Sequence, residues 1–190
     1  MKIFSMLAVA FCSLFLLNAH AQTDAPKGFK KGTITLTDGK QLSGFVKDNM
    51  RSNASVIFIS ETGTDKKTYH STDISSTTIE GTKFICVSGD FFKVLCEGEL
   101  NFLQKQSDAS GKLTYNGTEA VFSNGTDGKP NDYFIYNIKD RQLKLVSKKN
   151  VDDVTASCFA GHTAAIEKAK SVNGDLSQIK EAVEIYNSGN

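Results

Sequence analysis

This sequence of 190 residues has almost no excess of charge of either sign, few histidines and only one long apolar run. Its 22 basic and 21 acidic side chains leave a formal net charge of +1. Proteins that bind nucleic acid through phosphate contacts need a concentrated basic face. The short basic groups at 27–31 and 148–149 are too small to supply one, so we expect no nucleic-acid partner.

The sequence holds three histidines, and only His70 and His162 lie beyond residue 21. This scarcity restricts metal sites and acid–base catalysis that depend on imidazole. The motifs G-x-S-x-G, H-E-x-x-H, G-x-x-x-x-G-K-[ST], G-x-G-x-x-G and C-x-x-C are also absent. We therefore expect no cofactor, and the sequence favours a non-enzymatic protein over an enzyme without deciding between them.

The one long apolar run lies at the N-terminus. It covers Ile3–Leu17, follows Lys2 and leads to Ala19-His20-Ala21, which has the small residues that signal peptidase reads. We predict a secretory signal peptide at residues 1–21. The run is shorter than the roughly 20 residues that span a bilayer. A lipoprotein anchor needs a cysteine directly after the apolar run, whereas Cys12 lies in the middle of it. No later stretch is apolar enough to cross a membrane, so we expect an exported protein, periplasmic or extracellular.

Three cysteines remain after such a cleavage: Cys86, Cys96 and Cys158. An odd number allows one disulfide with a leftover thiol, or none. A turn at Gly89-Asp90 predicts a hairpin that places Cys86 opposite Lys93 rather than Cys96. A disulfide needs Cα atoms roughly 4.4–6.8 Å apart, so this register excludes a bond between Cys86 and Cys96. A bond from Cys158 to either one, and three free thiols, both stay open.

Hydropathy patterning divides the rest of the chain into three parts. We expect a polar leader at 22–32, an antiparallel β domain at 33–149 and a C-terminal helical tail at 150–190, which together make an α+β fold. Residues 33–37 alternate polar and apolar, and Asp38-Gly39 is a strong hairpin signal. Further strands are expected, each bounded by turn residues, at 41–47, 56–59, 67–70, 77–79, 84–87, 91–96, 100–103, 113–115, 120–122, 133–138 and 142–146.

Helical periodicity replaces strand alternation in the tail. Val151, Val154 and Cys158 have the spacing of one helix face. A second helix is expected at 164–172, ended by Asn173-Gly174, and a third begins after Asp175. Because isolated helices below roughly 12–15 residues are marginal in water, we expect these to dock on the sheet or on each other.

The start of the β domain follows the pattern G-x-I-x-L-x-D-G-x-x-L-x-G. The matching residues are Gly32, Ile34, Leu36, Asp38, Gly39, Leu42 and Gly44. This pattern resembles the opening of small SH3-like or Sm-like barrels. The resemblance covers about 50 residues and implies a barrel-like beginning of the sheet.

The chain as a whole resembles a family of uncharacterised exported proteins from Gram-negative Bacteroidota. The features that carry this resemblance are the signal ending, the Asp38-Gly39 hairpin, Phe-Phe-Lys-Val-Leu at 91–95, Leu-Lys-Leu-Val at 143–146 and the tail ending at 184–187. The resemblance implies a cell-envelope location and a layout of strands followed by helices. It implies no activity.

Cys158 and His162 are the sharpest candidates for chemistry. At positions i and i+4 they would share a helix face, where they could form an activated thiolate or two metal ligands. Gly161 lies between them and is expected to interrupt the helix. A core cysteine beside a histidine in a capping region is the competing interpretation.

Oxygen-bearing side chains gather in the loop around Asn124, Asp127 and Asp132. These are weak candidates for a calcium site, but their spacing misses the EF-hand template, and turn formation also accounts for them. Two hypotheses follow from the sequence. The first is a non-enzymatic envelope protein that binds a protein or small-molecule partner, and the alternative is a thiol-dependent enzyme or redox protein that uses Cys158 with His162.

Overall fold

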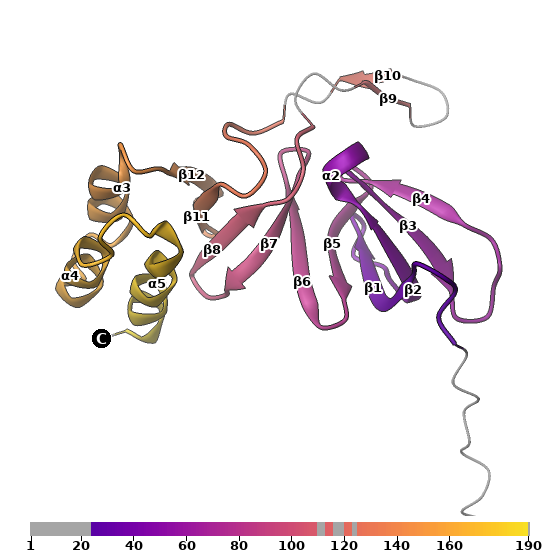
Figure 1. Cartoon of the computed structure of the whole chain (residues 1–190), viewed down its shortest axis with the longest axis horizontal. Helices are drawn as coiled ribbons and strands as arrows, with labels where there is room; N and C mark the ends of the chain where they lie inside the picture. Colours follow the sequence, from indigo (N-terminus) through magenta and orange to yellow (C-terminus); the bar gives the residue numbers. More distant parts are fainter. Residues whose placement is uncertain (1–23, 110–112, 116–119, 123–124, 190) are drawn as a thin grey trace, which may run out of the picture.

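Antiparallel strands come first along the chain and helices come last (Figure 1). The computed structural model describes residues 24–109, 113–115, 120–122 and 125–189. The expected signal peptide at 1–21 lies outside the described residues. Within them, no helix is long and apolar enough to cross a membrane.

The strands are β1 (Lys30–Leu36), β2 (Gln41–Asn49), β3 (Ser55–Ser60), β4 (Lys67–His70), β5 (Ile74–Ile79), β6 (Thr82–Val87), β7 (Asp90–Cys96), β8 (Leu100–Lys105), β9 (Leu113–Tyr115), β10 (Ala120–Phe122), β11 (Tyr133–Asn137) and β12 (Gln142–Val146). The helices are α2 (Met50–Asn53), α3 (Val151–Cys158), α4 (Thr163–Lys170), the 3₁₀ helix η2 (Leu176–Gln178) and α5 (Ile179–Ser188). Every expected strand is present within a few residues, and so is the helical tail.

Ten of the strands form one antiparallel sheet in the order β12-β11-β8-β7-β6-β5-β1-β2-β3-β4, and β9 pairs with β10 in a separate hairpin. The expected α+β class, an antiparallel sheet with C-terminal helices, is confirmed. The expected barrel-like opening is a finer prediction, and no pairing among the described residues joins β4 to β5. Barrel closure is therefore not shown, and β4 is a terminal strand.

Two glycines face each other across the first two strands. Gly32 on β1 pairs with Gly44 on β2. A Cβ atom on Gly44 would overlap the carbonyl oxygen of Ile59, and one on Gly32 would overlap that of Thr78. These strands can approach their neighbours closely only because neither position carries a side chain.

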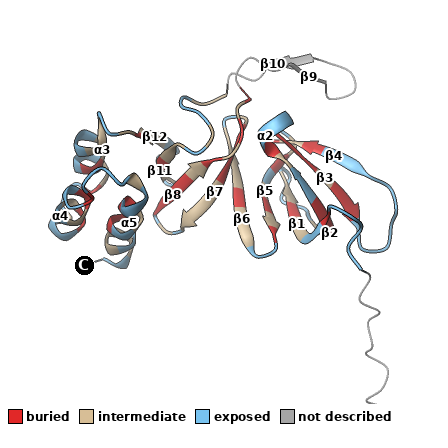
Figure 2. Cartoon of the chain, in the orientation of Figure 1, coloured by how far each residue is buried: buried red, intermediate tan, exposed pale blue. Residues whose placement is uncertain are grey.

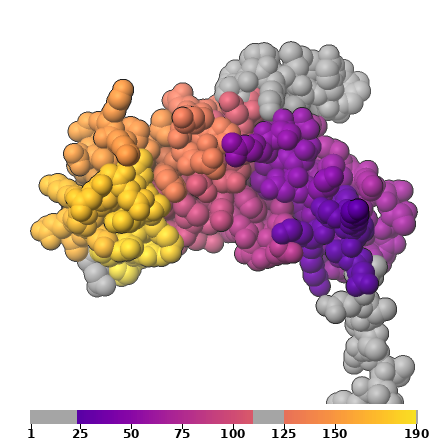
Figure 3. All heavy atoms as spheres, in the orientation of Figure 1, coloured from indigo at the N-terminus to yellow at the C-terminus, as the bar shows by residue number. Residues whose placement is uncertain are grey.

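Two main apolar clusters hold the sheet, one in each half (Figure 2). The concave side of the first half, over strands β1 to β7, encloses Ile34, Val46, Met50, Val56, Phe58, Tyr69, Ile74, Ile79, Phe84 and Phe91. In the second half, helices α3 to α5 cover one face of β8, β11 and β12. The space-filling view shows the helices at one end of the molecule and the first strands at the other (Figure 3).

Helix α5 docks on β8 through the Asn187 side chain, which hydrogen-bonds both backbone groups of one β8 residue, as a neighbouring strand would. The Leu100 backbone N–H donates to Asn187 Oδ1 at 3.0 Å, and Asn187 Nδ2 donates to the Leu100 carbonyl at 2.8 Å. Asp175 caps the start of η2 by accepting from the Ser177 N–H, as expected for this position. The tail is thus tied to the sheet by hydrogen bonds as well as by apolar packing.

Two details of the sequence interpretation are corrected. Strand β1 begins at Lys30, so the polar leader ends before residue 32; Phe29, just ahead of it, packs into a small apolar cluster on the outer face of the sheet. The β6–β7 turn is Ser88-Gly89, with φ of 48° and 87°, rather than Gly89-Asp90. Cys86 consequently pairs with Phe91 and not with Lys93.

Candidate functional site

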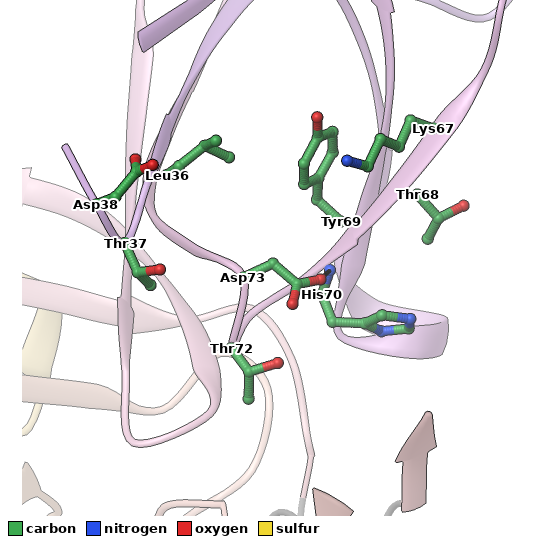
Figure 4. Close-up of a pocket in the computed structure, with 9 residues that line it drawn as sticks. All are labelled: Leu36, Thr37, Asp38, Lys67, Thr68, Tyr69, His70, Thr72 and Asp73. Carbon is green, nitrogen blue, oxygen red and sulfur yellow. Dashed lines mark hydrogen bonds between the residues drawn. The ribbon is translucent and has the colours of Figure 1, made fainter. Parts of the chain in front are cut away.

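A hollow of about 510 Å³ opens between β4, the last strand of the sheet, and the end of β1. We call it the seam hollow because it lies beside β4, which has a neighbouring strand on one side only in the described sheet. Its size is within the range of ligand-binding pockets. Figure 4 shows the residues that line it: Leu36, Thr37, Asp38, Lys67, Thr68, Tyr69, His70, Thr72 and Asp73.

Tyr69 and Leu36 form the apolar floor of the seam hollow and face each other from opposite walls (Figure 4). Tyr69 belongs to the buried cluster of the first half and makes an edge-on contact with Phe58, with ring centroids 6.3 Å apart. Lys67 extends its ammonium group over the Tyr69 ring, 4.7 Å from the ring centroid. The floor is therefore a largely buried aromatic ring, 7% exposed, beneath a positive charge.

Strand alternation places the side chains of Thr68 and His70 on the opposite side of β4 from Tyr69, as Figure 4 shows. The backbone alternates as well. His70 N–H donates to Asp73 Oδ2 at 2.8 Å, and the His70 carbonyl accepts from Asp73 N–H at 2.9 Å. The backbone N–H and carbonyl of His70 thus point away from β3. Backbone groups two residues apart in a strand point the same way, so the N–H and carbonyl of Thr68 face the unpaired edge of β4.

The polar rim of the hollow carries charges of both signs. Asp38 Oδ1 accepts from the Lys40 N–H at 2.9 Å, which holds the carboxylate at the β1–β2 turn. Lys67 stands on the other wall. His70 Nδ1 is buried and is the one such side-chain atom in the described part of the chain that lacks a hydrogen-bond partner. A ligand here would meet an apolar floor flanked by an ammonium group and a carboxylate.

The pair Cys158 and His162 does not share a helix face. Helix α3 ends at Cys158, and Gly161 has a φ of 85°, so the chain turns between the two residues. His162 instead precedes α4, and its ring packs on Tyr186 with centroids 4.4 Å apart. The expected interruption at Gly161 is confirmed, and the i, i+4 geometry that thiolate activation required is absent.

None of the three described thiols is activated by its surroundings. Burial raises the pKa of Cys158 above its ordinary value, against smaller lowering effects from Lys144 and from a hydrogen bond with Ser157. Burial also raises the pKa of Cys86 and of Cys96. All three cysteines are free of disulfides. A raised pKa leaves less of the nucleophilic thiolate at neutral pH.

Two of the three candidate calcium ligands, Asp127 and Asp132, lie in the described residues, and both make contacts with nearby lysines. Asp132 Oδ2 accepts from the Lys129 N–H at 2.9 Å, and the backbone carbonyl of Asp127 accepts from Lys105 Nζ at 3.2 Å. Asn124 lies outside the described residues. Over the ranges that the structure describes, no three His, Cys, Asp or Glu side chains gather closely enough to hold a metal ion.

The sequence missed the seam hollow although it predicted the strand that forms it. Residues 67–70 were expected as one strand among many, with no indication that one edge would stay unpaired. The free edge arises from distant pairings, since β5 joins β1 and leaves β4 at the end of the sheet. The useful local signal was Lys67 at the start of β4, with Lys66 just before it, because lysines often occupy edge strands.

No protein-family model matches the chain, and neither does any curated protein sequence or any solved structure. The candidate site therefore rests on its own geometry. That geometry consists of an apolar floor, a charged rim and an unpaired strand edge within one hollow.

Proposed function

We propose that this chain is an exported, non-enzymatic binding module of the cell envelope that holds its ligand in the seam hollow. The observation that carries the proposal is the position of the hollow beside β4, which has a neighbour on one side only within the described sheet. An apolar floor with a few polar groups around it is the usual composition of a ligand site. The partner is a protein segment or a small molecule met after export.

The export part of this proposal draws on the signal pattern at residues 1–21 and on the resemblance to exported Bacteroidota proteins. The binding part draws on the strand order β5-β1-β2-β3-β4. We infer that these five strands make a small barrel of the SH3-like kind that is left open at the seam. The facing glycines Gly32 and Gly44 support this inference, because they allow the bend that a small barrel needs.

The thiol alternative has less support. Cys158 and His162 lie on different elements, and burial raises the pKa of Cys158. A thiol-dependent mechanism needs the opposite shift and a base within reach. The binding proposal uses the exposed residues Lys67 and Thr68 of β4, whereas the thiol proposal requires a rearrangement of the α3–α4 connection.

Native mass spectrometry of the protein taken from its host's envelope tests this proposal. The blocking variant is Thr72→Trp, because Thr72 is exposed and lines the hollow. The matched control is Thr163→Trp, which makes the same change at an exposed position at the start of α4. We expect added ligand mass on the wild type and on Thr163→Trp, and a bare chain for Thr72→Trp. A bare wild type, or equal ligand mass on Thr72→Trp, would overturn the proposal.

A further inference from the structure

The unpaired edge of β4 offers backbone hydrogen bonds that the opposite wall does not. Thr68 presents its N–H and carbonyl to the seam. Across the hollow, the Leu36 N–H donates to the Lys40 carbonyl at 2.9 Å, and the Thr37 N–H donates to the Asp73 carbonyl at 3.2 Å. These two N–H groups of the opposite wall are therefore taken, whereas the N–H and carbonyl of Thr68 on β4 face the hollow.

The two bonds between His70 and Asp73 set the limit of that edge. They occupy the outward backbone groups of His70, so pairing with a guest ends at Thr68. The available edge is short, which suits a peptide segment better than a whole sheet. An extended peptide also presents alternate side chains to one face. Every second residue of the guest would therefore face the floor of the hollow.

One guest side chain would enter the space between Tyr69 and Leu36, and this position favours an apolar residue. The guest residue two positions away lies on the same face and passes Lys67, whose ammonium group is held over the Tyr69 ring. Lys66 lies on the other face of the sheet, with its Nζ 5.8 Å from the centroid of the Phe29 ring, so Lys67 is the positive charge that this guest residue meets. Charge complementarity therefore favours an acidic residue at that second position.

We propose that the ligand of the seam hollow is an extended peptide segment, with an apolar residue and an acidic residue two positions apart, that pairs with β4 as an added strand. This inference rests on the proposed function and names the ligand class. Strand addition gives affinity through the backbone and specificity through alternate side chains. Lys67 opposes pairing with basic strands, as edge lysines generally do, whereas an acidic guest residue neutralises it.

The first experiment uses two phage-displayed libraries of short peptides, selected on the immobilised chain. One library places an acidic residue two positions from an apolar one, and the other places a basic residue there. We expect clones to be enriched from the acidic library only. Equal enrichment from both libraries, or none from either, would overturn the inference.

The second experiment measures the affinity of an enriched synthetic peptide for edge variants. Thr68→Pro removes the outward N–H without touching the bonds to β3, and proline is tolerated at an outward-facing position of an edge strand. Thr68→Val is the control, because it keeps the N–H while changing the same side chain. We expect Thr68→Pro to weaken binding at least about tenfold and Thr68→Val to bind as the wild type does. Unchanged binding by Thr68→Pro would overturn strand addition.

The outcomes separate this inference from the proposed function. A peptide that binds Thr68→Pro normally but fails on Thr72→Trp would keep the hollow as a ligand site and remove strand addition. Failure of both libraries, together with ligand mass on the protein from its host, would point to a ligand that is not such a peptide. A wild-type dimer that Thr68→Pro dissociates would overturn the inference in favour of a second copy on β4.

Discussion

Lys105 Nζ lies 3.2 Å from Asp90 Oδ2, and neither side chain has any solvent exposure. Lys105 also donates to the backbone carbonyls of Thr126, Asp127 and Gly128. The Asp90 carboxylate accepts from residues of two loops, namely Ser107, Ala109 and Thr126. The pair thus joins both ends of the long connection between β8 and β11 to the start of β7, next to the β6–β7 turn.

The variant Asp90→Asn should lose about 3–5 kcal/mol in the free energy of unfolding, because it leaves the Lys105 ammonium buried without its counter-charge. Chemical denaturation measures this loss. The matched control is Lys30→Met, which breaks an ion pair with Glu80 that is more than half exposed on both sides. Exposed pairs contribute at most about 1 kcal/mol. A loss for Asp90→Asn no larger than for Lys30→Met would contradict this role.

The variant Asn187→Ala should release the end of α5 from β8. Both backbone groups of Leu100 would then lose their partner in a buried place, and each unsatisfied group costs about 1–3 kcal/mol. Limited proteolysis of the tail gives the direct measurement, and Glu184→Ala on the same helix is the control. Glu184 is exposed and makes one ion pair within the helix, with Lys180. Equal protease resistance of the two variants would show that Asn187 is not needed for docking.

The variant Gly44→Ala should be strongly destabilising, because its Cβ would meet the Ile59 carbonyl oxygen inside a paired strand. Neighbouring Ser43 is exposed, so Ser43→Ala should change the melting temperature little. Thermal unfolding followed by circular dichroism compares the two. A Gly44→Ala protein as stable as Ser43→Ala would mean that β2 and β3 do not approach as closely as described.

Thiol chemistry should be slow in the folded protein and fast in the unfolded one. Burial raises the pKa of Cys86 above its ordinary value near 9.0. Above pH 9, therefore, the thiol loses its proton in the unfolded state but keeps it in the folded state. The contribution of Cys86 to the free energy of unfolding is therefore fully present below pH 9 and decreases as the pH rises above 9. The variant Cys86→Ala should remove that part of the decline. A decline that is identical in both proteins would show that Cys86 is accessible.

Local patterns predicted most elements of this fold. The alternation at 33–37, the Asp38-Gly39 turn and the helical spacing from Val151 each concern residues close in sequence, and the structure has the corresponding elements. The β6–β7 turn was misassigned because Asp90 is a common turn residue. Its carboxylate is instead buried with Lys105, and Ser88 takes one of the two positive-φ positions that a two-residue hairpin turn needs.

The candidate site could not be predicted because its parts come together through distant pairings. The joining of β1 to β5 decides which strand ends the sheet, and neither Leu36 nor Tyr69 differs in sequence from an ordinary core residue. Cys158 and His162, which looked most reactive in sequence, are separated by a turn at Gly161. Spacing along a chain indicates proximity only while one helix continues through it.

Residue-resolved amide hydrogen exchange of β4 tests the free edge most directly. In the protein without a peptide, the Thr68 amide should exchange rapidly, while the Tyr69 amide, which points to β3, should be protected. An apolar–acidic peptide selected on the chain should slow exchange at Thr68 and leave Tyr69 unchanged. Protection of Thr68 equal to that of Tyr69 before any peptide is added would contradict the account, because the edge of β4 would then already be paired.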